Sequence, residues 1–524
     1  METAAISVPE KAPTKASKNL GSLARGTGLS FTGEAGHIIL TYAYGILIAR
    51  FLGSGDYGNF FLGMTIFNLI CLFVLSGVED TLMRFIGLHA TSGEESQTRT
   101  VIRISFLIAI GAGVVLGCAC YLLKDILAER IFHKPELAVV MGYISLAVPV
   151  FALMTVSVTA IRGYKIVFPY VFVRKIFLPA MSLALAAAVM VTGGGLRNLS
   201  LSYLLSVVIS AGFGYALLIR HLSPFSGLTE PLADRRRFLS FLGAAYATNI
   251  LIFFTTWSDL IILGVMTSSE QLGVYFAAKR TAMAIGILML SLNVILGPVI
   301  SHLYSGNHYE QLNRAFKTAT QWIIILGLPV LVMTLLFPKE ILMLFGPGFT
   351  EGREALIILT CGQFLNLSVG SVGYMLMMTG NQRWMVADAV GAVVINIPLM
   401  ILLVSRYGIN GAAWASAVTL ALAGFVALAQ IYFLLKLHPF SIRYVKLLML
   451  ASITAGVCWL IKACLPDDAS VMLIAGQIGF VFLFFFSLVL VFGLTGTEKK
   501  RLFDLRRKPL PAMIREILEG KETI

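Results

Sequence analysis

Charged side chains are scarce in this sequence. Only 13% of its 524 residues are Asp, Glu, Lys or Arg, whereas 58% are hydrophobic. Soluble domains carry about 25% charged residues. A soluble core of this size would need a polar shell that the chain does not have. The composition therefore excludes a soluble globular protein and indicates an all-α polytopic membrane protein.

Cysteine, histidine and nucleotide-binding signals are also sparse. The six cysteines all fall in apolar segments, which indicates no disulfide framework. The seven histidines are scattered, so we expect no metal site and no cofactor. No GxxxxGK[ST] phosphate-binding motif occurs in the sequence, so we expect no built-in ATPase. The residues form no catalytic constellation, and we predict that the chain is not an enzyme.

Long apolar runs, by contrast, fill most of the chain. A membrane-spanning helix needs roughly 20 mostly apolar residues. We predict about fourteen such helices with short connections, which leave no room for a soluble domain. Their ranges are 28–51, 58–83, 102–122, 137–161, 166–191, 199–220, 238–264, 272–301, 318–337, 354–378, 384–404, 411–434, 444–464 and 470–495.

The distribution of Lys and Arg predicts the orientation of these helices. With the N-terminus in the cytoplasm, most of the 40 basic residues fall in cytoplasmic segments, as the positive-inside rule requires. The basic segments are a tail at 1–27, a linker at 221–237 and a tail at 496–524. We therefore predict two cytoplasmic termini, and attribute the net charge of +13 to topology and to the lipid surface, not to nucleic acid.

Two segments of the sequence repeat at nearly one offset. Gly58 aligns with Gly273, and Gly163 aligns with Gly380, so the two matches are displaced along the chain by almost the same amount. This indicates duplication of a six-helix unit. The expected organisation is an N-lobe at 28–220, a C-lobe at 238–434 and two appended helices within 444–495. Transporters built from two such bundles bind their substrate between them.

Three long runs carry a family resemblance. They are ARFLGSGDYGNFFLGMTIFNLICLFVLSGVEDTLMRFIG, WSDLIILGVMTSSEQLGVYFAAKR and LMLFGPGFTEGREALIILTCGQFLNLSVGSVGYMLMMTGNQ. Over roughly residues 20–440 the chain resembles the polysaccharide transporter family of the multidrug/oligosaccharidyl-lipid/polysaccharide exporter superfamily. The resemblance implies a flippase in the bacterial cytoplasmic (inner) membrane. It would move undecaprenyl-pyrophosphate-linked repeat units to the outer leaflet by alternating access, for lipopolysaccharide O-antigen or exopolysaccharide synthesis.

Other functions stay open on the sequence alone. Within the same superfamily they are a multidrug antiporter and an exporter of the peptidoglycan precursor. A membrane polysaccharide polymerase or ligase is disfavoured, because the outward loops, the longest near 123–136 and 338–353, are short and hold no acidic or histidine cluster. The expected partners are a lipid-linked oligosaccharide and the bilayer. A polysaccharide polymerase and chain-length machinery are candidate partners, and a proton or sodium ion is the candidate coupling ion.

Two adjacent cations lie inside the eighth predicted span. Ionisable residues within spans are functional candidates by default. Lys279 and Arg280 lie two turns from the outer end of the span, and snorkelling to the surface is the simplest alternative. We predict that Asp259, on the neighbouring span, pairs with one of them and that the other faces the cavity. Because a guanidinium binds pyrophosphate oxygens in a bidentate manner, both cations are candidate substrate-binding residues.

The repeat alignment shows that these charges belong to one lobe. The register that matches Gly58 to Gly273 places Met64 and Thr65 opposite the two cations and Tyr44 opposite Asp259. Charges that the helical scaffold needs would be expected in both copies. Their presence in the C-lobe alone favours a role in a site.

A second cationic pair lies early in the fifth predicted span. Arg174 and Lys175 follow the start of that span, at 166, by more than two helical turns. Either the span begins later, near Ile176, and both residues lie at the cytoplasmic interface, or they form a landing point for the pyrophosphate on the cytoplasmic side. Both interpretations remain open, and the two residues are candidates for substrate binding.

Several other ionisable residues lie within or near spans. Glu34 is flanked by glycines that allow close helix approach, and with His37 it is a candidate for ion coupling. A structural hydrogen bond across helices is the alternative. Asp80 and Arg84 are four residues apart, which predicts an interfacial ion pair. Asp388 lies early in the eleventh span and is expected at the interface or facing the cavity.

Overall fold

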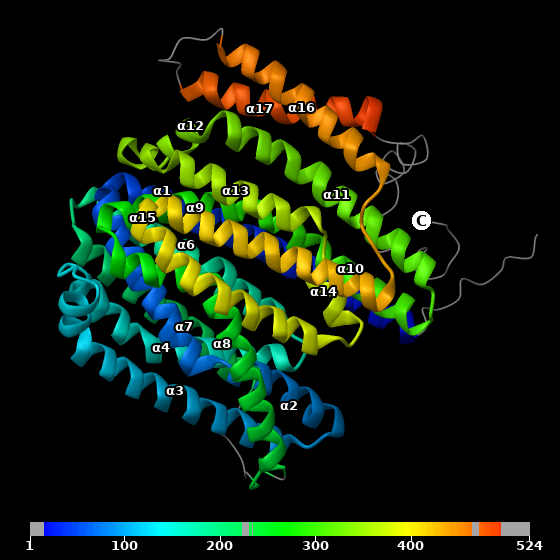
Figure 1. Cartoon of the computed structure of the whole chain (residues 1–524). Helices are drawn as coiled ribbons and strands as arrows, with labels where there is room; N and C mark the ends of the chain where they lie inside the picture. The colour runs from blue at the N-terminus through cyan, green and yellow to red at the C-terminus, as the bar shows by residue number, and fades with distance from the viewer. Residues whose placement is uncertain (1–14, 223–229, 233, 464–470, 494–524) are drawn as a thin grey trace, which may run out of the picture.

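The chain folds into long helices joined by short turns (Figure 1). A computed structural model describes residues 15–222, 230–232, 234–463 and 471–493. The helices are α1 (Lys15–Leu75), α2 (Val78–Ser92), α3 (Glu95–Ile126), η1 (Leu127–Ile131), α4 (Leu137–Gly163), α5 (Phe168–Tyr170), η2 (Val171–Phe177), α6 (Leu178–Val191), α7 (Leu196–His221), α8 (Arg235–Met266), α9 (Ser269–Met283), η3 (Ala284–Gly286), α10 (Ile287–Ser305), α11 (Tyr309–Leu336), α12 (Pro338–Met343), η4 (Pro347–Gly352), α13 (Arg353–Ser368), α14 (Val372–Met378), α15 (Gln382–Leu435), α16 (Ile442–Ala463), α17 (Val471–Leu488) and η5 (Val489–Gly493). Most of the predicted tails, at 1–27 and 496–524, lies outside the described residues.

The two longest helices are each interrupted at one glycine. Gly53 has φ 76° within α1, and Gly408 has φ 57° within α15. Only glycine adopts this left-handed region without a steric penalty. Each break falls between two predicted spans, so α1 with α2 accounts for the first two spans, and α15 accounts for the eleventh and twelfth.

Other predicted spans are bent or broken. The eighth span divides at the 3₁₀ turn η3, directly after the segment that carries Lys279 and Arg280. In the described part of the chain, eight helices are long and apolar enough to cross a membrane, or ten when each of two bent pairs is taken as one span. The chain is thus a multi-pass membrane protein, and the number of fourteen spans stays a prediction.

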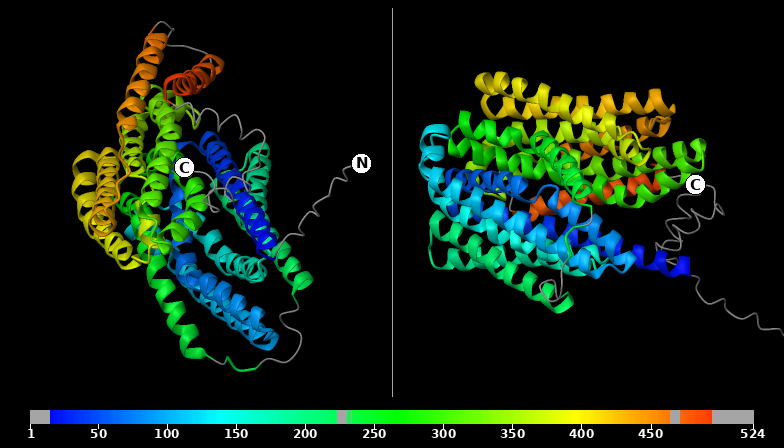
Figure 2. Two further views of the ribbon diagram at one scale, coloured as in Figure 1. Left: turned by 90° about the vertical axis from the view of Figure 1, so that its right-hand side faces the viewer. Right: turned by 90° about the horizontal axis from the view of Figure 1, so that it is seen from below.

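The helices form two bundles that lie side by side (Figures 1 and 2). We refer to α1–α7 as the N-terminal bundle and α8–α15 as the C-terminal bundle; α16 and α17 pack outside the second bundle, on α11. We call the end that carries residues 127–136 and 338–352 the loop end. The opposite end, where α1 begins, is the tail end (Figure 2, right).

The two bundles touch at the loop end through the glycines that define the repeat. A β-carbon on Gly58 would overlap the carbonyl oxygen of Ser269, and a β-carbon on Gly273 would overlap the carbonyl oxygen of Ser54. These two contacts exchange under the alignment that matches Gly58 to Gly273. The two matched segments therefore pack against each other about an approximate two-fold axis, and side chains larger than glycine do not fit at this contact.

Candidate functional site

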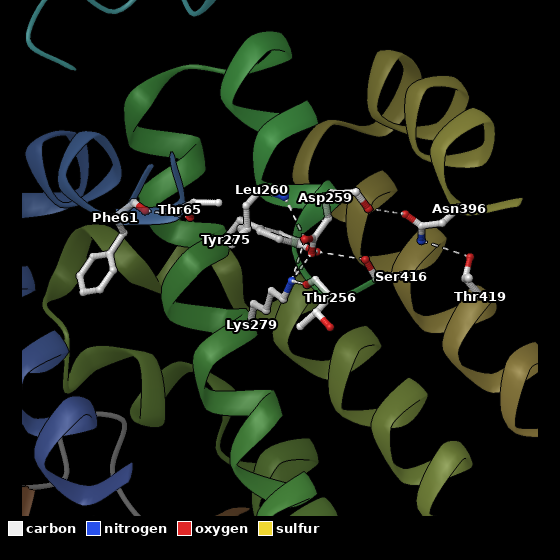
Figure 3. A network of polar contacts seen from close by, with 11 residues as sticks. Phe61, Thr65, Thr256, Asp259, Leu260, Tyr275, Lys279, Asn396, Ser416 and Thr419 are labelled. Carbon is white, nitrogen blue, oxygen red and sulfur yellow. Dashed lines mark hydrogen bonds and ion pairs between the residues drawn. The ribbon is translucent and has the colours of Figure 1, made fainter. Parts of the chain in front are cut away.

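Lys279 and Asp259 form a buried ion pair inside the C-terminal bundle (Figure 3). The Lys279 Nζ lies 2.6 Å from Asp259 Oδ1 and 2.7 Å from Oδ2. The side chains of Lys279 and Asp259 are only 12% and 5% exposed. Lys279 also donates to the Thr256 carbonyl at 2.7 Å. The structure confirms the predicted pairing of Asp259 with one of the two cations, and that cation is Lys279.

Neighbouring groups complete the hydrogen bonding of Asp259. The Tyr275 hydroxyl donates to Asp259 Oδ2 at 2.8 Å, and the Leu260 N–H donates to Oδ1 at 2.9 Å. Ser416, on α15, lies 3.3 Å from the Tyr275 hydroxyl. Burying a carboxylate is tolerable only with such a set of partners. The sequence offered one signal for Tyr275, since it precedes Lys279 by four residues and so shares its helix face.

A small cavity lies beside this ion pair. Its volume is about 170 Å³, and Asp259, Lys279 and Asn396 are among its lining residues. The Ser258 hydroxyl donates to Asn396 Oδ1 at 3.3 Å, and Asn396 Nδ2 donates to Thr419 Oγ1 at 3.2 Å. These contacts continue the polar network from α8 to both halves of α15 (Figure 3). The sequence analysis did not identify Asn396 or Thr419.

Arg280 turns away from its neighbour and crosses to the N-terminal bundle. Its guanidinium donates to the Thr41 carbonyl of α1 and lies 5.3 Å above the Phe61 ring. A β-carbon on Gly45 would lie 3.2 Å from the Arg280 Cζ, so this glycine makes room for the guanidinium. The adjacent Thr281 hydroxyl lies 3.1 Å from the Tyr42 hydroxyl of α1. Arg280 therefore lies at the interface between the two bundles.

The first half of the chain has no matching charges at the equivalent positions. Tyr44, the equivalent of Asp259, is buried with its ring 6.2 Å from that of Phe60. Thr65, the equivalent of Arg280, is buried and donates to the Phe61 carbonyl at 2.9 Å. The polar site is therefore asymmetric.

Arg174 and Lys175 lie on the π-helical segment η2 and are both paired with carboxylates. Arg174 Nη1 lies 2.6 Å from Glu79 Oε2, and Lys175 Nζ lies 2.9 Å from Glu34 Oε2. A π-helical turn often marks a functional position. Here it places two consecutive cations toward two carboxylates of α1 and α2. Both residues lie within the apolar helical stretch Phe168–Val191.

The glycine beside Glu34 allows α1 to approach η2 closely. A β-carbon on Gly33 would overlap the Val171 side chain, as expected for a close helix contact. Glu34 pairs with Lys175 across this contact, which matches the alternative of a structural bond across helices. The Nδ1 of His37 is buried and has no hydrogen-bond partner among the described residues.

The predicted ion pair between Asp80 and Arg84 is wrong. Asp80 Oδ2 instead accepts a hydrogen bond from Asn249 Nδ2 of α8 at 3.1 Å, and Arg84 lies 4.3 Å above the Phe241 ring, also of α8. Each has a partner on the other bundle, and these contacts replace the pairing along α2. Asp388 lies within α15, where its Oδ1 accepts from Gln430 Nε2 at 2.5 Å.

The comparison with protein families accounts for most of the chain. Residues 47–351 match the model of a family described as polysaccharide biosynthesis protein. The chain belongs to this family. One curated relative of the chain is the probable low-salt glycan biosynthesis flippase Agl15 of Haloferax volcanii. It is 23% identical over 403 residues, which cover 76% of this chain and 78% of the relative. The probable flippase AglR of the same organism is 25% identical over 245 residues, covering 46% and 50%.

Comparison with solved structures shows the fold of this chain. The lipid II flippase MurJ in an inward closed conformation superposes with a TM-score of 0.68 at 16% identity, covering 89% of this chain and 98% of MurJ. An inward-facing multidrug resistance MATE transporter of the MOP superfamily gives 0.60 at 15% identity, covering 76% and 94%. The predicted polytopic transporter fold is confirmed. The named relatives and neighbours are flippases and transporters, in agreement with the prediction that the chain is not an enzyme.

Proposed function

We propose that the protein is a flippase that moves a lipid-linked oligosaccharide across the membrane, with Arg280 binding its pyrophosphate. The observation that carries the proposal is the environment of Arg280. Its guanidinium is held by a backbone carbonyl of the opposite bundle and by a ring face, not by a carboxylate. A guanidinium has five N–H donors. An anion entering between the bundles would therefore meet a cation whose charge these contacts do not neutralise.

Lys279 has a different part in this proposal. The charge of Lys279 is balanced by Asp259. In this proposal Lys279 positions the α8 and α9 segments around Arg280 and does not contact the substrate. The same pair bears on the multidrug alternative. A cationic drug calls for a carboxylate, and Asp259, the carboxylate beside the small cavity, is already neutralised by Lys279.

The contacts between the bundles are compatible with alternating access. At the loop end, Arg50 donates to the Leu344 carbonyl at 2.8 Å, and Lys134 donates to the Gly264 and Thr267 carbonyls at 2.6 and 2.7 Å. Cations that bind carbonyls can separate without leaving an unpaired carboxylate behind, which is the costly outcome for a buried ion pair. We assign the tail end to the cytoplasm, so this state would be closed to the outside.

The finer identity of the cargo belongs to the same proposal. We propose undecaprenyl-pyrophosphate-linked repeat units of an O-antigen or exopolysaccharide, in the bacterial cytoplasmic membrane. The family match and the curated flippase relatives support a glycan cargo. A polysaccharide polymerase and chain-length machinery remain candidate partners, and a proton or sodium ion remains the candidate coupling ion.

The experiment is to locate the lipid-linked oligosaccharide in cells that lack the protein. The proposal expects it on the cytoplasmic leaflet, with its return to the outer leaflet when the gene is restored. Unpolymerised units on the outer leaflet would instead indicate a polymerase. Accumulation of the peptidoglycan precursor alone would indicate the related exporter. Loss of ethidium efflux with normal glycan export would favour the multidrug alternative.

A further inference from the structure

A second, larger cavity lies between the bundles toward the tail end. Its volume is about 550 Å³. The N-terminal bundle contributes α2, and the C-terminal bundle contributes α8 and the start of α15. The polar and aromatic residues that line it are Asp80, Arg84, Phe241, Thr248, Asn249 and Gln382. None of them belongs to the Lys279–Asp259 network or contacts Arg280.

The charged groups of this cavity are held apart from each other. Asp80 and Arg84 are spaced for an ion pair along α2. Instead, Asp80 accepts from Asn249 at 3.1 Å, and Arg84 lies 4.3 Å above the Phe241 ring. A carboxylate offers only acceptors, and a guanidinium offers only donors. Because they are separated, the cavity presents both kinds of group along one wall.

The lining chemistry fits one class of ligand. Asn249 and Gln382 can each donate and accept, which adds to the acceptors of Asp80 and the donors of Arg84. A sugar hydroxyl also does both, and the apolar face of a sugar ring packs on an aromatic side chain such as Phe241. A phosphate matches the donors of Arg84 but not the carboxylate of Asp80, and a cation matches Asp80 but not Arg84, so neither fits the whole wall.

We propose that this cavity is a carbohydrate subsite that binds the neutral glycan part of the cargo while Arg280 binds the pyrophosphate. This rests on the proposed function. The hydrogen bond from Asn249 to Asp80 joins the two bundles across the subsite. A glycan that replaces or bridges this hydrogen bond contacts both bundles at once. The subsite therefore selects for glycan, and the cationic site selects for the lipid-linked anion.

The test measures protection of a cysteine placed in the cavity. The six native cysteines are replaced to give a background that retains transport, and Thr248→Cys is added as the reporter. The Thr248 hydroxyl donates to the Ala244 carbonyl of its own helix, so the change disturbs little. The exposed Ser305→Cys, at the tail end of α10, is the matched control. Inverted membrane vesicles expose both positions to a membrane-impermeant maleimide.

Two probes separate the glycan from the lipid anion. One is the glycolipid fraction from host cells that lack this gene, and the other is undecaprenyl pyrophosphate without sugar. At ten times its apparent Kd, the glycolipid is expected to slow labelling of Thr248→Cys about tenfold, and to leave Ser305→Cys unchanged. The sugar-free lipid is expected to protect neither. Asp80→Asn in the reporter background should weaken glycolipid protection about tenfold.

The outcomes distinguish the subsite from the proposed function. Equal protection by the sugar-free lipid, or protection by the cation tetraphenylphosphonium, would overturn the carbohydrate assignment. If the vesicles transport the glycolipid while Thr248→Cys stays unprotected, the subsite is wrong and the flippase proposal stands. If the same vesicles transport no glycolipid, the flippase proposal itself fails.

Discussion

Lys279 and Arg280 are neighbours in sequence, yet their side chains bind to different bundles. Lys279 is paired with Asp259 within the C-terminal bundle, and Arg280 donates to the Thr41 carbonyl of the N-terminal bundle. One cation stabilises its own bundle, while the other joins the two bundles. Substitution of the two residues should therefore have different consequences, one for stability and one for transport.

Arg280→Ala should reduce transport and leave the fold intact. The variant loses the donor that we assign to the pyrophosphate, and a hydrogen bond to a charged group contributes about 1.5–3 kcal/mol, or at least about tenfold. Transport of the glycolipid from the outer to the inner leaflet of inverted membrane vesicles measures this loss. Arg353→Ala is the control, since this exposed arginine lies at the loop end. Wild-type transport by Arg280→Ala would rule out binding of the pyrophosphate by Arg280.

Lys279→Ala should destabilise the protein. It leaves Asp259 buried without its cation, which costs about 3–5 kcal/mol. The double variant Lys279→Met/Asp259→Leu removes both charges and should recover most of this loss, since the two residues are coupled. Thermal unfolding in detergent micelles measures both effects, with the exposed Lys446→Ala as control. Losses that simply add in the double variant would show that the two charges do not depend on each other.

The contacts that follow from local geometry could be predicted from the sequence. Asp259 and Lys279 lie at similar depths on two helices joined by a tight turn, so their pairing follows from hairpin geometry. The close approach of α1 to η2 at Gly33 follows from the missing side chain of this glycine. Gly53 and Gly408 fall in the predicted connections, where a left-handed residue ends one helix and begins the next.

The contacts between bundles could not be predicted in the same way. The acceptor of Arg280 is a backbone carbonyl, a group that every residue carries, so no residue type marks Thr41. The pairing of Asp80 with Arg84 failed because spacing along a helix describes an isolated helix surface. Here Asn249 and Phe241 of the other bundle offer alternative partners, and only the packing of α2 on α8 brings them there.

Closure of the loop end should depend on pH through Lys134. This side chain is buried against the C-terminal end of α8, and burial lowers the pKa of its ammonium group. In a state open at the loop end it would be solvated and titrate near the ordinary pKa of about 10.4. Between the lowered and the ordinary pKa the open state binds more protons, so rising pH favours the closed state. Below the lowered pKa, pH has no effect through this group.

Spin labels at Glu129 and Glu351 would report this closure, because the two exposed residues lie at the loop end on different bundles. The distance distribution should shift toward the closed state as the pH rises toward the ordinary lysine pKa of about 10.4. Lys134→Met should abolish the shift. A shift of equal size in that variant would assign the pH dependence to another group.

Gly58→Ala and Gly273→Ala should have nearly equal effects, and both should open the loop end. A β-carbon at either position meets a backbone carbonyl of the opposite bundle, Ser269 or Ser54, which cannot rotate away as a side chain could. Overpacking of this kind costs about 1–3 kcal/mol, and it should act against the closed state, in which the two segments touch. The ratio of closed to open molecules should therefore fall by about fivefold or more in each variant. The distance between spin labels at Glu129 and Glu351 measures this ratio.

Gly212→Ala is the control, since a β-carbon there has no atom within 4 Å. A loss of closure in only one of the two variants would contradict the two-fold arrangement of the repeat.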